Sequence, residues 1–531
     1  MFCKRNAEAQ ACTNDSVFSL FRVLCAILLA VTIITLLILK EDNYTQPWMF
    51  AIAIVITFAF SLFQMRSQKQ LSKCFIFFLS VVLSLFQMLI VKSYLFETSW
   101  DVWTVLRAAE AEAYHTEWIP WFDEYFSTYP NNCLLTAFYS FLFRWIPTNQ
   151  PIFLIACVNC SLSGLTSYFL YRTVCLVKDE ISGLTVWILY WLILGLSPWI
   201  SITYSDPLVL IFPIVCLYIF FLDEQEARKQ QTAFSAHLHA LRIFLTFFIA
   251  GIGYRIKPQT LIPAIAIFIC FTFKNLLAHR LRREILDCLA AILGGGLSIL
   301  ICKHISNLQM MTLNAEAALQ PTHWMMMGLN PFNKGRYWEN DVLFSKSFLT
   351  SAERWNGNIE VIRERLSDFG FWGYAQFLGK KLEICMGDGT FYWAKNADSF
   401  FNVVFPYSGH LGSFTRAFYY TDGKFYQIFH NVSNVLWAFL ISSSFVGLCF
   451  GIGNRKNQTY TVVYLSILGL IMFELIFEVF PRHLYSFAPV FIIAAEQGIS
   501  GVTCCVRKYR KQKGKVCVNE ATNFMDRDSL L

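Results

Sequence analysis

Long apolar stretches alternate with short polar or basic stretches along almost the whole chain. A helix needs about 20 apolar residues to cross a bilayer, with a working range of about 17–25. The pattern therefore predicts an all-α polytopic membrane protein with about 12 transmembrane helices. The predicted spans are residues 23–39, 47–65, 74–91, 151–171, 184–203, 207–222, 243–253, 258–273, 285–302, 434–453, 460–478 and 486–504.

One further apolar stretch, residues 133–145, is too short to cross the membrane comfortably. The chain needs an odd number of crossings between Pro130 and Arg172 if both regions keep the sides that the surrounding charges indicate. We therefore expect this stretch to form a partial helix that dips into the membrane, or packs beneath the adjoining polar segment. Such elements occur at membrane depth only where protein covers them.

The basic residues define the predicted topology. Lys and Arg favour cytoplasmic loops, and they concentrate near both termini and between Lys274 and Arg283. Both termini are therefore predicted to be cytoplasmic. The expected divisions are a cytoplasmic N-terminus 1–22, three transmembrane helices 23–91, a first outer segment 92–132, a transmembrane core 133–302, a large outer segment 303–431, three transmembrane helices 432–504 and a basic cytoplasmic tail 505–531.

Composition narrows the function classes. Of the 531 residues, 56% are hydrophobic and 15% are charged, whereas soluble domains are about 45–50% apolar and about 25% charged. This excludes a soluble enzyme, a disordered regulator and a nucleic-acid-binding module. The formal net charge of +7 is modest, so the positions of the few charged residues carry the information. We expect an integral, multi-pass protein of the plasma membrane.

The two outer segments concentrate polar and aromatic residues. In the first, Asp101 opens a predicted interfacial helix, where a plain capping role is an equal alternative. Asp123 and Glu124 stand beside aromatic residues, which suits either interfacial anchoring or a sugar platform. In the second, the stretch around His323 and Trp324 has a composition that suits carbohydrate binding, although its aromatic residues also suit the membrane interface.

Three predicted helix ends on the outer face carry charged residues. Charges this close to the hydrocarbon are costly and tend to mark substrate sites. Cations there suit a phosphate group, and the alternative is that they extend to lipid headgroups. The three features contain Tyr204 and Asp206, Arg255 and Lys257, and Glu478, Arg482 and His483. Glu474 and Glu478 are four residues apart, so we expect them on one helix face.

These residues together resemble a known superfamily. An Asp in the first large outer segment, followed by an interfacial helix and a Tyr-Pro turn, resembles the GT-C membrane glycosyltransferases, which include protein O-mannosyltransferases, aminoarabinose transferases and oligosaccharyltransferases. The carrying residues are Asp101 and Tyr129-Pro130-Asn131-Asn132. The arrangement of Tyr204 and Asp206, Lys257-Pro258, the HWMMMGLN stretch and Pro481-Arg482 is most similar to bacterial family-39-type members.

The resemblance implies a reaction. A sugar on a polyprenyl-phosphate donor would pass, with inversion, to a glycan, lipid or protein acceptor at the outer face, as in cell-envelope glycan synthesis. It implies Asp101 as general base, Asp206 or Asp123 orienting the acceptor or a cation, and cations on the departing phosphate. The implied phosphate ligands are Arg255, Lys257, Arg482 and His483, and the implied acceptor or sugar contacts are Asp123, Glu124, Tyr129, Asn131, Tyr204, His323 and Trp324. No cofactor is required and no metal-ligand cluster is recognisable, although a divalent cation is compatible with the chemistry.

Three other readings compete with this one. A transporter or flippase of lipid-linked sugars would show repeated halves with broken helices and polar residues at the midplane, and neither is apparent. A glycan polymerase or ligase would share the lipid-linked donor and the long outer segment. A non-enzymatic membrane scaffold would leave the charges at the outer helix ends unexplained.

Overall fold

The computed structural model describes residues 2–42, 44–67, 71–228, 234–307, 309–393, 400–403, 409–451 and 459–528. Nearly all of these residues are helical, and one antiparallel pair joins β1 (Phe96–Thr98) to β2 (Phe400–Val403). The prediction of an all-α polytopic membrane protein is confirmed, because ten helical spans in the described ranges are long and apolar enough to cross a bilayer. Two shorter apolar helices accompany them.

The long spans keep the order that the hydrophobic pattern predicts. They are Ser16–Ile38 within α1 (Phe2–Ile38), α2 (Pro47–Arg66), α3 (Lys73–Lys92), α7 (Pro151–Cys175), Ser205–Arg228 with α9 (Ser205–Leu208) and α10 (Ile211–Arg228), His237–Ile256 within α11 (Phe234–Ile256), Pro258–Leu277 with η4 (Pro258–Leu261) and α12 (Ile262–Leu277), α13 (Leu281–Asn307), α19 (Tyr426–Gly451) and Pro481–Arg510 with η8 (Pro481–Phe487) and the start of α21 (Ala488–Asp528). The shorter ones are Glu180–Gly195, with α8 (Glu180–Tyr190) and a π-helical turn η2 (Trp191–Gly195), and α20 (Thr461–Ile476).

Three predicted spans differ from the observed helices. The span predicted to reach residue 203 stops at Gly195, because Pro198 disfavours a helical backbone at the preceding residue and a short 3-10 turn η3 (Pro198–Ser201) follows. The span predicted over 243–253 is much longer, because polar residues at the start of α11 are buried against α10. The span predicted to reach residue 478 stops at Ile476, where the backbone becomes extended.

The two outer segments predicted from the sequence fold into several helices, most of them short. The first contains α4 (Trp100–Tyr114), α5 (Pro120–Thr128) and the 3-10 turn η1 (Pro130–Asn132). The second contains η5 (Ala315–Ala317), α14 (Pro321–Gly328), α15 (Glu339–Lys346), α16 (Ser351–Met386) and α18 (His410–Tyr419). A capping box of Thr350 and Glu353 begins α16, and Gly370, at a φ of +56°, kinks it. Between the first segment and α7 lies the predicted partial helix, α6 (Cys133–Trp145), which packs against α4.

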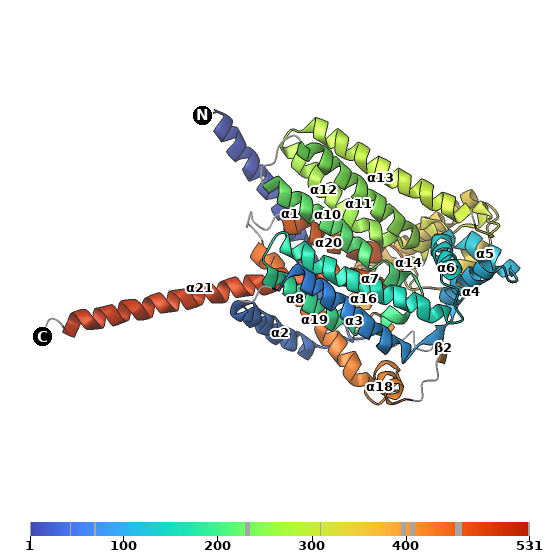
Figure 1. The fold of residues 1–531 in the computed structure, drawn as a ribbon. Coiled ribbons are helices and arrows are strands. Elements are labelled where there is room, and N and C mark those ends of the chain that lie inside the picture. Colours follow the sequence, from blue (N-terminus) through green and yellow to red (C-terminus); the bar gives the residue numbers. More distant parts are fainter. Residues whose placement is uncertain are drawn as a thin grey trace.

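The helices form one bundle with two distinct ends (Figure 1). The N-terminal part of α1 and the long C-terminal helix α21 leave the bundle on one side, and α4, α5, α14 and α18 lie on the opposite side. We call these the terminus end and the loop end. The bundle is closely packed where α11 meets α13 and α19 meets α21. A side chain at Gly294 would collide with the Phe244 carbonyl, and one at Gly498 with the Ser443 carbonyl, so these glycines allow the helices to approach.

Candidate functional site

Asp101 lies in the first turn of α4 at the loop end. The N-cap residue of this helix is Ser99, so the plain capping role considered for Asp101 is wrong. The preceding residue, Trp100, has a φ of +51°, a conformation that costs energy for a residue with a side chain. This turn directs the Trp100 ring against Tyr204, with centroids 5.8 Å apart. Strained positions of this kind occur preferentially at functional sites.

Hydrogen bonds hold Asp101 in a network from three parts of the chain. The Tyr204 hydroxyl lies 3.2 Å from Asp101 Oδ2 and 3.2 Å from Asn132 Oδ1. The Asn132 amide donates to the Tyr125 hydroxyl at 2.6 Å, and Tyr125 is close enough to Asp101 to interact with it electrostatically. Burial, with the nearby Tyr204 and Asp101, raises the pKa of Tyr125 well above its usual value, so its hydroxyl remains a donor at neutral pH. The Asp101 carboxylate is therefore held by the Tyr204 phenol and forms no ion pair with a cation of the described residues.

Arg482 lies directly beside this network. Its guanidinium carbon lies 4.9 Å from the centre of the Trp100 ring, 5.9 Å from that of Tyr204 and 4.7 Å from that of Phe480. Its Nε is buried without a hydrogen-bond partner, and no described residue forms an ion pair with it. Aromatic faces orient a guanidinium without satisfying its N–H donors. The cation is thus positioned and still able to bind an anion.

A buried ion pair lies on the other side of Arg482. Asp206, in the first turn of α9, pairs through Oδ1 with the Lys257 ammonium, which precedes the turn η4. Both side chains are buried, with 0% and 6% of their residue surfaces exposed. Asp206 Oδ2 has no hydrogen-bond partner, and Arg482 is close enough to interact electrostatically with this carboxylate. Two helix ends that are far apart in the sequence therefore meet at Arg482.

The segment between α20 and η8 completes the cluster. Glu474 accepts hydrogen bonds from the Phe480 backbone N–H at 3.0 Å and pairs with His483 Nδ1 at 2.9 Å. Glu478 lies beyond the end of α20, so the expectation that it shares a helix face with Glu474 is wrong. Burial raises the pKa of Glu478 despite the nearby His483 and Arg482. Among the described residues, none hydrogen-bonds to its side chain.

Lys381 of α16 connects the segment between α20 and η8 to the second outer segment through hydrogen bonds. Its buried ammonium donates to the carbonyls of Gly328 at 2.8 Å, Leu475 at 2.9 Å and Phe477 at 2.6 Å. Burial lowers its pKa to about 8. Three donors thus match three acceptors, including carbonyls left unpaired at the end of α20. Sequence patterning did not indicate Lys381, because a lysine in a polar helix is normally solvent-exposed.

Several of the predicted sugar or acceptor contacts lie near Asp101. The Tyr129 ring lies 5.2 Å from that of Tyr125 and 6.3 Å from that of Trp324. Burial and the charge of Asp101 raise the pKa of Tyr129. Asn131 reaches the network through a 3.3 Å hydrogen bond to Asn132. Asn132 is the buried member of this pair, and the spacing of the Pro-Asn-Asn turn did not reveal which asparagine points inward.

Other predicted residues lie outside the cluster. Asp123 accepts hydrogen bonds from the Trp118 indole at 3.1 Å and the Thr312 backbone at 2.9 Å, so it joins the two outer segments. Glu124 forms a surface ion pair with Lys346 at 3.2 Å. His323 is buried beside Ser345, and Arg255 interacts electrostatically with Cys133 and Cys302. No described residue forms a hydrogen bond or ion pair with the Arg255 side chain.

The donor set bears on metal binding. In the described ranges, no group of three or more His, Cys, Asp and Glu side chains is arranged to hold a metal ion. Asp101, Asp206 and Glu474 are instead bonded to a phenol, an ammonium, and an imidazole and a backbone N–H group, respectively.

Comparisons with known proteins place the chain among membrane proteins. A family model described as a conserved hypothetical integral membrane protein matches residues 10–501. No curated protein matches the chain. Among solved structures, the chain is similar to the archaeal oligosaccharyltransferase AglB from Archaeoglobus fulgidus, in complex with an inhibitory peptide and a dolichol-phosphate. The sequence identity is 14% and the TM-score is 0.35. The match covers 82% of this chain and 52% of AglB, so this chain spans about half the length of AglB.

Proposed function

We propose that this chain, which belongs to the family of conserved hypothetical integral membrane proteins, is a membrane glycosyltransferase. It transfers a sugar from a polyprenyl-phosphate donor to a hydroxyl of a glycan, lipid or protein acceptor at the loop end. The observation that carries the proposal is that Asp101 and Arg482 both contact Tyr204, the first by hydrogen bond and the second through the ring face. A base and an unpaired cation are thus held at one place.

The proposed reaction uses the Asp101 carboxylate as general base. It takes the proton of the acceptor hydroxyl while that oxygen bonds to the anomeric carbon. The bond between the anomeric carbon and the phosphate oxygen breaks on the opposite face, and its electron pair leaves with the lipid phosphate. The anomeric configuration is inverted. The hydrogen bond from Tyr204 to Oδ2 fixes the carboxylate, so Oδ1 is the oxygen that we assign to the acceptor proton.

Arg482 is assigned to the leaving phosphate. Negative charge develops there in the transition state, and a cation already held in place stabilises it without reorganisation. Arg482 meets this requirement because aromatic rings orient it and its Nε has no partner. We assign Lys257 as a second phosphate contact, held by Asp206. His483 is bonded to Glu474, so we assign it to positioning the segment that carries Arg482.

The aromatic side chains beside Asp101 are assigned to the sugar or acceptor. Tyr129 and Trp324 present rings from the two outer segments, and aromatic faces bind the apolar faces of sugars. We place Asp123, Glu124 and His323 in the framework that joins these segments, because their contacts lie within it. The basic residues near both termini support a cytoplasmic terminus end, so the loop end would face outward.

The test is Asp101→Asn in the full chain, assayed with a polyprenyl-phosphate-linked sugar. Removing a general base is expected to lower the rate of transfer by about 10²- to 10⁴-fold. Asp123→Asn is the matched control, because Asn keeps the acceptor oxygen that bonds Trp118 and Thr312. Transfer by Asp101→Asn at the wild-type rate would remove Asp101 as base. Movement of the lipid donor across the bilayer without any sugar transfer would instead identify a transporter.

A further inference from the structure

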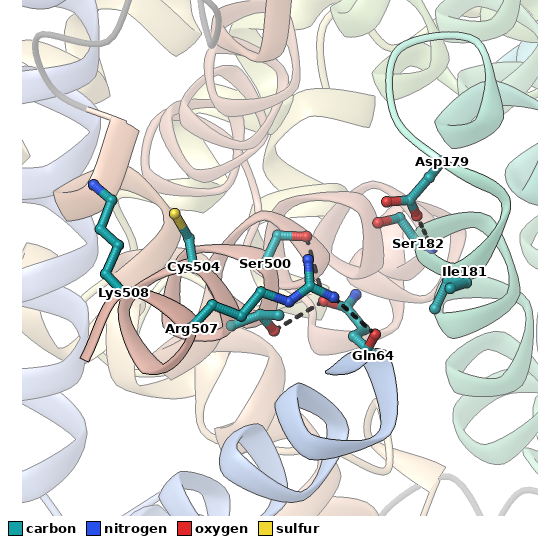
Figure 2. A pocket seen from close by; sticks show the side chains of 9 residues that line it. Gln64, Asp179, Ile181, Ser182, Ser500, Cys504, Arg507 and Lys508 are labelled. Atoms are coloured by element: carbon teal, nitrogen blue, oxygen red, sulfur yellow. Dashed lines mark hydrogen bonds between the residues drawn. The ribbon is translucent and has the colours of Figure 1, made fainter. Parts of the chain in front are cut away.

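A polar cavity opens at the terminus end, far from Asp101 along the helices. It lies between the last turn of α2, the first turn of α8 and the part of α21 around Ser500–Lys508, and its volume is about 390 Å³ (Figure 2). The side chains that matter are those of Gln64, Asp179, Ser182, Ser500, Arg507 and Lys508. None of the residues assigned to glycosyl transfer lines this cavity.

The floor of the cavity is internally paired. Gln64 accepts a hydrogen bond from Thr503 at 3.1 Å and donates one to Glu496 at 3.3 Å. Ser500 also donates to Glu496, and the Glu496 carboxylate pairs with Lys178 at 2.6 Å. These bonds make the floor polar, rigid and close to neutral. The groups available to a ligand are therefore those of the two walls.

One wall supplies cations. Arg507 and Lys508 are exposed side chains of α21. A single hydrogen bond of 3.3 Å, to the Gln64 carbonyl, uses one of the five N–H donors of Arg507. The remaining donors of the guanidinium suit the oxygens of a phosphate. Figure 2 shows the Arg507 side chain extending toward Gln64.

The facing wall supplies an anion and a hydroxyl. Asp179 caps α8 by accepting a hydrogen bond from the Ser182 backbone N–H at 2.7 Å through Oδ1. No described residue forms an ion pair with Asp179. Ser182 lines the cavity, and its hydroxyl forms no hydrogen bond with a described residue. The hydroxyl is therefore available as a donor or acceptor to a ligand in this cavity.

We propose that this cavity binds a headgroup that carries both a phosphate and a primary amine. The phosphate binds Arg507 and Lys508 and takes the Ser182 hydroxyl as a donor, and the ammonium binds Asp179. A simple anion would face the Asp179 carboxylate, and a simple cation would face Arg507. The cavity lies where the last turn of α2 and the basic part of α21 leave the bilayer, the level at which basic pockets between helices bind lipid headgroups.

The test measures lipid retention by the purified full chain. The protein is placed in phosphatidylcholine nanodiscs that contain phosphatidylethanolamine or phosphatidylglycerol, and the lipids that stay bound after detergent exchange are counted by native mass spectrometry. We expect preferential retention of phosphatidylethanolamine. Arg507→Gln should weaken this binding about tenfold, since a hydrogen bond to a charged group is lost. Arg510→Gln, an exposed arginine of the same helix outside the cavity, is the matched control.

Asp179→Asn tests the amine. Asparagine caps a helix as well as aspartate does, so α8 should remain intact while retention of phosphatidylethanolamine falls and that of phosphatidylglycerol does not. Equal retention of the two lipids by wild type, or no effect of Arg507→Gln, would overturn the proposal. Displacement of the lipid by soluble phosphoethanolamine at equal concentration would show that the same chemistry serves a free compound. These outcomes are independent of sugar transfer, so they do not depend on the proposed function.

Discussion

Buried charges occur at both ends of the bundle, but they are paired very differently. At the terminus end, His239 of α11 lies 2.7 Å from Asp223 of α10 and 3.2 Å from Asp287 of α13. Arg242 pairs with Asp223 at 3.1 Å and with Glu226 at 2.7 Å. Each of these two side chains has two carboxylates within reach. At the loop end, the partly buried Arg482 and Glu478, and one oxygen of the buried Asp206, lack such partners within the described parts of the chain.

This difference separates structural charges from charges available to a ligand. A buried ion pair whose hydrogen bonds are all formed holds helices in register. Removing one member lowers the stability of the protein, because the other charge stays buried without a partner. A buried charge without a partner is costly in the empty protein. It is retained where a ligand supplies the missing group, which is why perturbed and unpaired ionisable groups concentrate at functional sites. The loop end therefore has the properties of a binding site, and the Asp223–Arg242 cluster has those of a structural contact between helices.

Substituting one arginine from each end of the bundle, in separate variants, tests this distinction most directly. Arg482→Gln should lower sugar transfer by about 10²- to 10³-fold, the usual cost of losing one group that stabilises developing charge. Its thermal midpoint should fall less than that of the terminus-end variant below, because Arg482 forms no ion pair with a carboxylate of the described residues. Arg242→Gln should have the opposite profile. It leaves Asp223 paired with His239 alone and removes the partner of Glu226, so it should cost about 3 kcal/mol of stability, while the folded fraction keeps its transfer rate.

Purified variants in detergent give both quantities, from the thermal midpoint and from transfer per folded molecule. The comparison fails if the two variants lose stability and activity in the same proportion. It also fails if Arg242→Gln is as stable as wild type, because the ion pairs of the terminus end would then contribute nothing.

Hydrophobic patterning predicted most of the fold, and two of the three misplaced helix boundaries lie at charged residues. Periodicity identifies where an apolar helix begins when polar residues face water, but His239 and Arg242 are polar residues of α11 that face other helices. The sequence pattern therefore assigned them to a loop. The opposite error occurred at Glu478, where an apolar neighbourhood suggested a helix that had already ended at Ile476. Charges paired inside the bundle cannot be recognised from one segment alone.

The sequence indicated which residues belong to the candidate site, but it did not indicate their hydrogen bonds and ion pairs. Asp101, Tyr204, Asp206, Lys257 and Arg482 were all candidates because they are polar residues near helix ends, and the structure brings them together. The sequence did not reveal that Lys257 is paired while Arg482 is not, since this depends on which side chains meet across helices. The roles of Asn132, Tyr125 and Lys381 depend on the same long-range contacts and carry no local signal.

Lys381 is a loop-end cation that is bonded as fully as those of the terminus end, so it should behave as they do. Lys381→Met leaves the carbonyls of Gly328, Leu475 and Phe477 buried without donors, and should cost about 3 kcal/mol of stability. Transfer should fall as well, because the segment leading to Arg482 loses its attachment. The neighbour Lys380 is the control.

Lys380 is partly exposed and pairs with the exposed Glu41 at 2.9 Å and, at 3.4 Å, with the buried Glu383, which also accepts the Asp42 backbone N–H. Because Glu383 keeps this backbone partner and the Glu41 pair lies at the surface, Lys380→Met should change stability by only about 1 kcal/mol. Thermal unfolding of both variants in the same detergent decides the matter. Similar losses from the two substitutions would mean that the three carbonyl bonds of Lys381 do not fasten the segment.

The smallest effect is expected at His323, the loop-end counterpart of His239. Ser345 donates its hydroxyl proton to Asn358 at 2.9 Å, so His323 must donate from Nδ1 to Ser345 at 2.7 Å. Its Nε2 is then a buried acceptor without a partner. Protonating Nε2 would bury an uncompensated charge, and burial accordingly lowers the pKa of His323 to about 4.

Because this pKa lies below the value of about 6.5 expected in the unfolded chain, the unfolded state takes up the proton more readily. Stability attributable to His323 is therefore complete above pH 6.5 and is lost as the pH falls toward 4, by about 2 kcal/mol between pH 7 and pH 5. His323→Gln should remove this part of the acid sensitivity of the thermal midpoint, whereas His115→Asn should not, because His115 is exposed. An unchanged pH profile in His323→Gln would mean that the imidazole finds an acceptor when charged, as His239 does between its two carboxylates.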